Sequence, residues 1–212
     1  MKLFLDSKNK QLFTAAGSVF FPQNRSWKSF EKGPLKGEEV TLFEAVKWLQ
    51  VDSGYPCRTP IAVLGGREAE PNQLTIAEDI GSRIAKMNLT LLCGGRQGIM
   101  EAACWGASKF GGISVGILPD ADLSLANPYV TVPISTGIGI ARNSIVARAG
   151  LCLIAVGGGY GTISEVAFGL QFEKNVFVMA NGPEIEGVYL CDDATQTMNG
   201  VALTILGLPI TF

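Results

Sequence analysis

From residue 61 onward, short apolar runs alternate with amphipathic segments, and no other feature of the sequence limits the fold so strongly. The runs are IAVL, LTLLC, GISVGIL, LCLIAV and NVFVM. Strands that are apolar along their whole length are buried on both faces, as in a parallel sheet covered by helices. The segments between them, such as LTIAEDIGSRIAKM, carry apolar residues at helical spacing. The pattern predicts an α/β fold, a doubly wound parallel sheet with helices on both faces.

The first 59 residues lack this alternation. KLFLDSKNKQLFTAAG is typical of a strand, a polar turn and a second strand. The next stretch, FPQNRSWKSFEKGPLKG, is expected to be a loop because it contains the breakers Pro22, Gly33, Pro34 and Gly37. Thr41 followed by Glu44 forms a capping-box pattern that opens a helix. We therefore expect residues 1–59 to be an N-terminal extension, a hairpin plus a helix, and residues 60–212 to be a Rossmann-like ligand-binding domain.

Composition excludes several classes of protein. The net charge is −2 with no basic block, which argues against nucleic-acid binding. Histidine is absent, so any acid–base chemistry falls to carboxylates, tyrosine, lysine or water. The five cysteines form no CxxC pair, and three lie in apolar or small-residue runs, as buried thiols in a reducing compartment do. The N-terminus lacks a signal region, and no run approaches the ~20 apolar residues of a membrane span. We expect a cytoplasmic protein that does not contact a membrane.

Three predicted strands end in glycine-rich turns, LGGRE, CGGRQG and VGGGYG. Two of these turns run directly into a helix, whose free backbone N–H groups and dipole favour a phosphate or another oxyanion. Carboxyl ends of parallel strands share one edge of the sheet, so the turns are expected to meet in one crevice. The alternative is that the glycines only allow strand and helix to pack closely. The candidate ligand-binding residues in these turns are Gly65, Gly66, Arg67, Gly94, Gly95, Arg96, Gly98, Met100, Gly158, Gly159, Tyr160, Gly161 and Thr162.

Two known phosphate-binding motifs are not matched by these turns. None contains GxGxxG, and no GK[ST] follows as in a P-loop. The next strand also ends in LLCGG, without the acidic residue of a dinucleotide site. NAD is therefore not expected as a cofactor.

Charged residues close to the turns are candidates for chemistry. Arg142 opens the segment ARNSIVAR after a glycine loop, and its guanidinium is expected either to contact a ligand or to form a surface ion pair. Glu165 lies three residues after Thr162, which makes TISE a capping-box pattern, yet the same position suits a catalytic carboxylate. Both alternatives stay open. Glu101 is expected to stabilise the start of its own helix, and Arg148 is expected to be structural.

Three segments, CGGRQGIMEAACWGA, ARNSIVARAG and VGGGYGTISEVAFGL, resemble the Rossmann-like family once named after lysine decarboxylases. That family includes the LOG cytokinin-activating phosphoribohydrolases and the molybdenum cofactor carrier proteins. The LOG signature P-G-G-x-G-T-x-x-E is matched from Gly157 to Glu165, except that Gly157 replaces its proline. The family's Arg-Lys pair falls on Arg142 and Asn143, so the arginine is kept and the lysine is not. The resemblance covers roughly residues 61–206.

The stretch ANPYVTVPISTGIGIARN is more similar to the carrier branch than to the LOG enzymes. The resemblance implies a homo-oligomer that carries the molybdenum cofactor, a molybdopterin, with Arg142, Asn143 and Glu165 among the binding residues. The first alternative is a LOG-like nucleoside 5′-monophosphate phosphoribohydrolase with Arg142 and Glu165 as catalytic residues. The second is a nucleotide-sensing domain that acts through a protein partner. Lysine decarboxylation is not expected, because no lysine for pyridoxal phosphate can be identified. No metal ligands are predicted.

Overall fold

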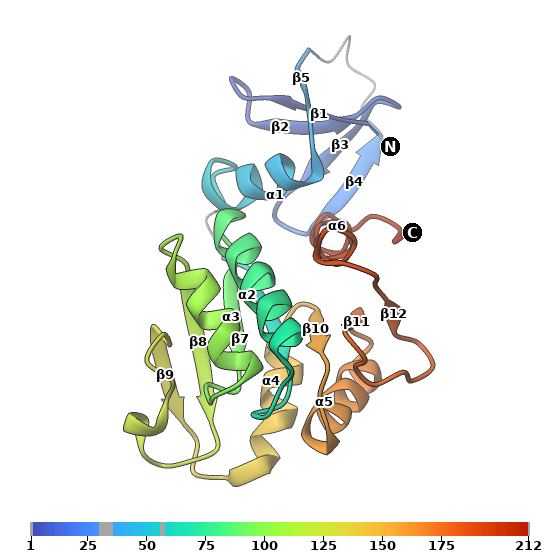
Figure 1. The fold of residues 1–212 in the computed structure, drawn as a ribbon. Coiled ribbons are helices and arrows are strands. Elements are labelled where there is room, and N and C mark those ends of the chain that lie inside the picture. The colour runs from blue at the N-terminus through green and yellow to red at the C-terminus, as the bar shows by residue number, and fades with distance from the viewer. Residues whose placement is uncertain (1, 30–35, 56–57, 212) are drawn as a thin grey trace. The chain divides into compact units, whose positions relative to one another are not determined.

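The computed structural model describes residues 2–29, 36–55 and 58–211, and its internal contacts divide the chain into two units (Figure 1). The α/β unit is Thr59–Met198, and the N-terminal unit combines Met1–Arg58 with Asn199–Phe212. The sequence assigned residues 199–212 to the α/β domain. In the structure, the indole N–H of Trp27 donates to the carbonyl of Leu206 at 2.7 Å, so these residues pack with the N-terminal segment.

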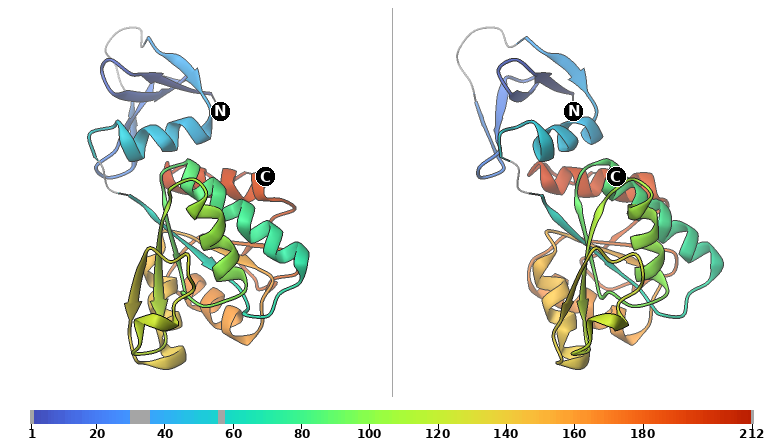
Figure 2. Two further views of the ribbon diagram at one scale, coloured as in Figure 1. Left: turned by 60° about the vertical axis from the view of Figure 1, so that its left-hand side comes forward. Right: turned by 90° about the vertical axis from the view of Figure 1, so that its left-hand side faces the viewer.

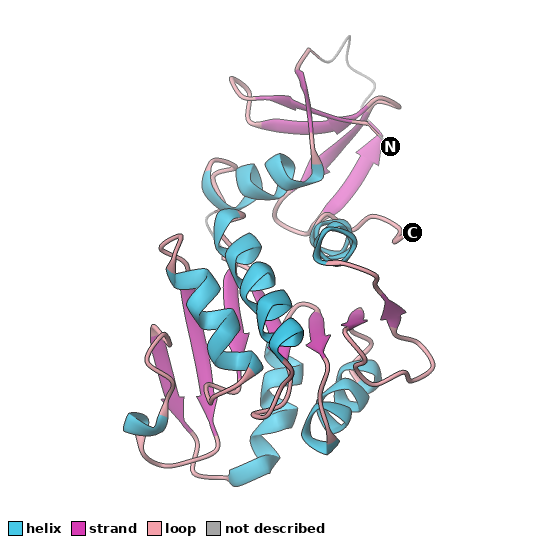
Figure 3. Cartoon of the chain, viewed as in Figure 1, coloured by secondary structure: helices cyan, strands magenta, loops and turns pink. Residues whose placement is uncertain are grey.

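A seven-stranded sheet, whose strands are magenta in Figure 3, forms the centre of the α/β unit. The order of its strands is β12-β11-β10-β6-β7-β8-β9. Every neighbouring pair of these strands is parallel, which confirms the predicted fold class. The strands are β6 (Pro60–Leu64), β7 (Thr90–Cys93), β8 (Ile113–Leu118), β9 (Val132–Ser135), β10 (Leu153–Val156), β11 (Val176–Met179) and β12 (Tyr189–Leu190).

Helices cover both faces of this sheet, with α2 and α3 on one side and α4 on the other (Figure 2). The helices are α2 (Pro71–Lys86), α3 (Ile99–Ser108), α4 (Asn143–Ala149), α5 (Tyr160–Gln171) and α6 (Ala194–Ile205), and short 3₁₀ turns are η1 (Leu123–Leu125) and η2 (Gly139–Arg142). α5 packs beside α4, and α6 starts in this unit and ends in the N-terminal unit.

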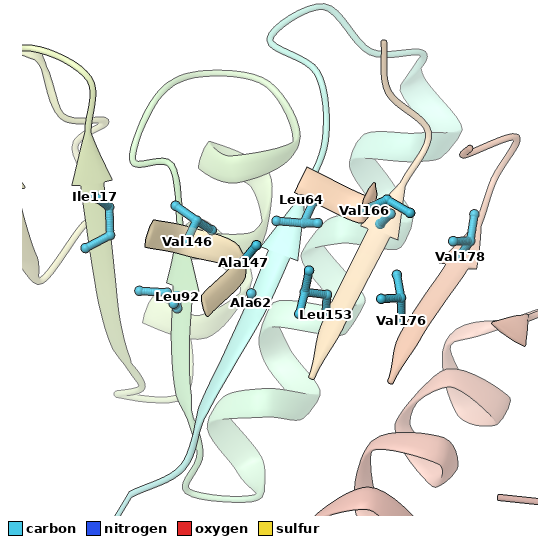
Figure 4. Close-up of a cluster of buried hydrophobic side chains, with 11 residues drawn as sticks. Ala62, Leu64, Leu92, Ile117, Val146, Ala147, Leu153, Val166, Val176 and Val178 are labelled. Carbon is cyan, nitrogen blue, oxygen red and sulfur yellow. The ribbon is translucent and has the colours of Figure 1, made fainter. Parts of the chain in front are cut away.

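The apolar strands meet in a core on the α4 and α5 side of the sheet (Figure 4). The cluster comprises Ala62, Leu64, Leu92, Ile117, Val146, Ala147, Leu153, Ala155, Val166, Val176 and Val178. Four strands of the sheet are buried at all or nearly all positions, and this explains why their sequences show no polar alternation.

Small residues allow α2 and α3 to cross closely. A Cβ at Gly81 would overlap the carbonyl of Ala103, and a Cβ at Gly106 would overlap that of Glu78. The Ser82 hydroxyl donates to the Gly106 carbonyl at 3.1 Å across the same contact. Gly81 and Gly106 therefore allow α2 and α3 to pack together within the chain.

The order of the strands shows at which edge of the sheet a ligand is expected to bind. β6 lies at the centre, the chain winds outward through β7, β8 and β9, and it returns to β10 on the opposite side of β6. The direction of winding therefore reverses between β6 and β10. In open α/β sheets, ligands bind beyond the carboxyl ends of the strands at this switch point. The glycine turns after β6, β7 and β10 all lie at this edge.

The N-terminal unit holds a five-stranded antiparallel sheet, in the order β4-β3-β2-β1-β5, and the helix α1 (Leu42–Val51). Its strands are β1 (Leu3–Asp6), β2 (Gln11–Thr14), β3 (Ser18–Phe21), β4 (Ser26–Ser29) and β5 (Glu38–Val40). The predicted hairpin is β1–β2. The capping box of α1 is confirmed, since the Thr41 hydroxyl accepts from the Glu44 N–H and the Glu44 carboxylate accepts from the Thr41 N–H.

The prediction of a loop across FPQNRSWKSFEKGPLKG was wrong for part of that stretch. Ser26–Ser29 forms β4 and pairs with β3, and the Trp27 ring packs on Phe20 with centroids 5.0 Å apart. The breakers Gly33 and Pro34 lie outside the described residues. The unit is therefore a sheet with a helix rather than a hairpin with a helix.

The cysteines in the described part of the chain form no disulfides. Cys93, Cys104, Cys152 and Cys191 are buried thiols, and Cys57 lies outside the described residues. The sulfur of Cys93 lies 3.6 Å from that of Cys104, at the end of β7. A free cysteine often packs in a core as a small apolar side chain does.

Candidate functional site

A cavity of about 430 Å³ lies at the switch point of the sheet. It is bounded by the turns after β6 and β7, by η2 and the start of α4, and by the first turns of α5. Of the predicted ligand-binding residues, its wall contains Gly65, Gly66, Arg67, Gly94, Met100, Arg142, Asn143, Gly159, Gly161, Thr162 and Glu165. The structure therefore brings residues from three glycine turns and from the ARN segment into one cavity, which we call the inner cavity.

The amino end of α5 opens into the inner cavity. Gly159 is the N-cap of this helix, and no side chain caps it. The N–H groups of a first helical turn have no partner within the helix, and the helix dipole places partial positive charge there. Since Gly161 and Thr162 line the cavity, this end of α5 offers donors to an anion.

Backbone conformation explains why Gly157 replaces the family proline. Gly157 has φ +54°, whereas the proline ring holds φ near −65°. A Cβ at Gly157 would also overlap the side-chain amide of Gln73, which donates to the carbonyl of Ala180 at 2.9 Å. The turn before α5 therefore follows a path that only glycine adopts readily.

Arg142 and Glu165 form a buried ion pair at the inner cavity. Arg142 Nη1 donates to Glu165 Oε1 at 2.9 Å, and the two residues are only 8% and 6% exposed. The guanidinium lies directly on the backbone of Gly94, where any Cβ would overlap it. Arg142 Nε is buried and has no partner among the described residues. The surface ion pair considered for Arg142 is therefore wrong, because its partner is internal.

Glu165 does not cap its helix. α5 begins at Tyr160, so Glu165 lies in the second turn and its carboxylate points to Arg142 rather than to the N-cap backbone. The capping-box alternative for TISE is therefore wrong. The sequence pattern gave the wrong result because it takes Thr162 as the start of the helix, whereas α5 begins two residues earlier, at Tyr160.

Asn143 connects the ion pair to α5. Its Oδ1 accepts from Arg142 Nη1 at 2.6 Å, and its Nδ2 donates to Ser164 Oγ at 2.9 Å and to the Gly161 carbonyl at 3.3 Å. The amide thus fixes the guanidinium relative to the first turn of α5. A lysine at this position has donors only, so it could not accept from the arginine.

Burial raises the pKa of Glu165 to about 7, because the cost of desolvating the carboxylate exceeds the attraction and the hydrogen bond from Arg142. The pKa in the folded chain is higher than the ordinary value of 4.5, so folding favours the protonated carboxyl. Its contribution to stability is complete below about pH 4.5 and is lost as the pH rises through about 7.

The raised pKa of Glu165 predicts how the stability of the protein depends on pH. Relative to Glu165→Gln, the wild-type chain is expected to lose up to about 3 kcal/mol of unfolding free energy between pH 4.5 and 8, at ~1.4 kcal/mol per pKa unit. Urea unfolding of both proteins across this range measures the difference, and the comparison cancels the titration of other groups. A difference that stays constant with pH would show that the pKa of Glu165 is not raised.

Several predicted ligand-binding residues lie outside the inner cavity. Arg96 Nη1 pairs with Asp120 at 3.0 Å and donates to the Leu125 carbonyl at 3.0 Å. Tyr160 is 93% exposed. Gly95 and Gly98 have positive φ and shape the turn before α3, and Gly158 lines a neighbouring cavity.

The other charged candidates have structural positions. Glu101 lies in the first turn of α3, as expected of a residue that stabilises a helix start. Arg148 stacks on the ring of Phe172, with its guanidinium carbon 5.0 Å from the ring centroid. Arg67 lines the inner cavity and is exposed, and no ion pair or hydrogen bond involves its guanidinium among the described residues.

Sequence reasoning missed the apolar part of the wall. Val63, Leu64 and Ile140 line the inner cavity, and Ile140 is 87% exposed. Val63 and Leu64 were interpreted only as core strand residues. Ile140 belongs to the glycine loop STGIGI. An isoleucine in such a loop, outside any helical or strand spacing of apolar residues, was the one signal in the sequence that it lines a cavity.

Two kinds of feature are absent from residues 2–29, 36–55 and 58–211. No three Cys, Asp or Glu side chains gather there as metal ligands would. No helix in the same residues is long and apolar enough to cross a membrane.

Known proteins that resemble this chain do so over most of its length. The model of LDcluster4, the SLOG cluster4 family, matches residues 58–202. A protein of Archaeoglobus fulgidus, described as uncharacterized, is 38% identical over 139 residues, which is 66% of this chain and 91% of that protein. The molybdenum cofactor binding protein of Rippkaea orientalis is 31% identical, with a TM-score of 0.65 over 69% of this chain and 96% of that one. The Moco carrier protein of Chlamydomonas reinhardtii is 33% identical, with a TM-score of 0.66 over 72% and 100%.

Proposed function

This chain belongs to the SLOG cluster4 family, and from that premise we propose that its inner cavity binds the phosphorylated pterin of the molybdenum cofactor and carries it unconverted. The observation that carries the proposal is the uncapped amino end of α5, which opens into the cavity beside Arg67, whose guanidinium has no partner in the part of the chain that the structure describes. Backbone N–H groups and an arginine together form a phosphate site. The structural relatives named for this cofactor align over nearly their whole length, which supports the cofactor as cargo.

Each part of the cavity has a role in this proposal. The N–H groups of Gly161 and Thr162 and the guanidinium of Arg67 hold the phosphate. The apolar wall at Val63, Leu64 and Ile140 packs on the ring system. The ion pair between Arg142 and Glu165 supplies a fixed donor and acceptor at the base of the cavity, which set the orientation of the ligand.

Substitution of Arg67 tests the phosphate site. Arg67→Ala is expected to weaken binding of molybdopterin about tenfold, since a charge-assisted hydrogen bond at an exposed position contributes ~1.5 kcal/mol. Arg96→Ala is the matched control, because Arg96 is held by Asp120 outside the cavity. Fluorescence titration with cofactor released from a molybdoenzyme measures both affinities. The proposed site would be contradicted if both variants lost the same affinity for molybdopterin, or if neither lost any.

Hydrolysis of a nucleoside 5′-monophosphate is the second candidate function, and the raised pKa of Glu165 favours it. In that reaction water attacks C1′ of the ribose, the bond to the base breaks, and the carboxylate of Glu165 takes a proton from the water. The same proton then passes to the leaving base, which restores the carboxylate. The products are the free base and ribose 5-phosphate. Release of adenine from AMP, lost in Glu165→Gln, would establish this function; the carrier proposal expects no release.

A further inference from the structure

A second cavity of about 700 Å³, which we call the outer cavity, adjoins the inner one. The two share Gly66, Arg67 and Gly159 as common wall residues. The outer cavity extends from this shared edge across the loop between β6 and α2 to Asn181, which follows β11. One continuous crevice therefore spans the carboxyl ends of β7, β6, β10 and β11.

Each cavity alone has the size of a complete small-ligand site, which typically measures ~300–1,000 Å³. A pterin or nucleoside monophosphate in the inner cavity would leave the outer one to solvent. The guanidinium of Arg67 and the amino end of α5 lie at the shared edge, so negative charge is favoured between the cavities as well as in the inner one.

The outer wall differs chemically from the inner wall. Gln73 is occupied, because its Nε2 donates to the Ala180 carbonyl and its Oε1 accepts from the Glu70 N–H at 3.0 Å. The Glu70 side chain accepts from the backbone of the first turn of α2. Glu68 and Asn181 have no hydrogen-bond or ion-pair partner among the described residues, and both line the cavity. Besides the shared Arg67, the side chains of the outer wall without a partner among the described residues are thus a carboxylate and an amide.

We propose that the ligand of this crevice has two ring systems joined through a diphosphate, with one ring in each cavity and the diphosphate at Gly66, Arg67 and Gly159. The ring in the outer cavity presents two adjacent N–H donors to the carboxylate of Glu68, as the edge of guanine or of a pterin does, and Asn181 adds a further hydrogen bond. A carboxylate has only acceptors, so it discriminates against adenine, whose corresponding edge carries a ring-nitrogen acceptor. The inference rests on the proposed function, which it extends from a monophosphate to a dinucleotide-type ligand.

Calorimetric titration with three commercial probes tests this inference. The probes are GMP, the dinucleotide GppG, in which two guanosines are joined by a 5′,5′-diphosphate, and its adenine counterpart AppA. GppG is expected to bind at least tenfold more tightly than GMP and than AppA. Glu68→Gln is expected to reduce the affinity for GppG about tenfold and to leave the affinity for GMP unchanged, because an amide NH₂ cannot accept from the base. Glu186→Gln, an exposed residue outside both cavities, is the matched control.

The outcomes separate this inference from the proposed function. If GMP binds and is weakened by Arg67→Ala, but GppG binds no more tightly and Glu68→Gln has no effect, the two-part ligand is overturned and the phosphate site stands. If GppG and AppA bind equally, the recognition by Glu68 is overturned. If none of the three probes binds, but molybdopterin binds and is weakened by Arg67→Ala, the two-part ligand is overturned and the proposed function stands.

Discussion

Replacing Arg142 with alanine is expected to lower the free energy of unfolding by about 3–5 kcal/mol at pH 8, the cost of breaking a buried ion pair from one side. Glu165 would then either stay charged without its partner or be forced to take up a proton. At pH 5.5 the loss is expected to be smaller, because the carboxyl, whose pKa is about 7, is already protonated there. Urea unfolding at both pH values measures the two losses.

The double variant Arg142→Ala/Glu165→Gln is the control for this prediction. Removing the carboxylate removes the uncompensated charge, so the double variant should regain most of the stability lost at pH 8. A loss below about 1 kcal/mol in the single variant, or a double variant that is no more stable than it, would show that the pair is not buried as described.

The second large effect is expected on ligand binding in Gly94→Ala. The added methyl group would occupy the position of the Arg142 guanidinium, which Glu165 and Asn143 hold in place. Displacement of this guanidinium is expected to lower the affinity for molybdopterin on the order of 100-fold, since a preorganised charged contact contributes ~3 kcal/mol. Fluorescence titration measures the affinity, and circular dichroism confirms that the variant is folded.

A mutant cycle isolates the cause of this loss. If the methyl group acts by displacing the guanidinium, Gly94→Ala should have almost no further effect in an Arg142→Ala background. Full additivity of the two substitutions would instead place the effect in the turn after β7 and would contradict the assigned contact.

The sequence predicted the α/β unit well because its signals are local and physical. Strands such as β10 and β11 are buried on both faces, so they are apolar throughout and are recognised without knowledge of their neighbours. Glycine turns at strand ends likewise indicated the edge where the cavity lies. The strand β4 was not predicted, because Pro22 and the glycines that follow it in the sequence indicated a loop. Two of the four residues of β4 are also serines, which are not typical of a strand.

The errors at the site have a common physical origin. Glu165 and Arg96 were each interpreted from their neighbours in the sequence, but their partners are remote. Glu165 pairs with Arg142, 23 residues earlier, and Arg96 pairs with Asp120, 24 residues later. Nothing in a local spacing shows such a partner. The same holds for the outer cavity, whose residues come from three separate segments of the chain.

The identity of the small molecule held by the natively purified chain tests the central claim most directly. The protein is denatured with acid, the released material is oxidised, and fluorescence and mass spectrometry identify and quantify any pterin. The account predicts a molybdopterin-derived pterin in an amount that falls in Arg67→Ala relative to Arg96→Ala. Absence of any pterin, together with failure of the purified chain to bind added molybdopterin, would contradict it.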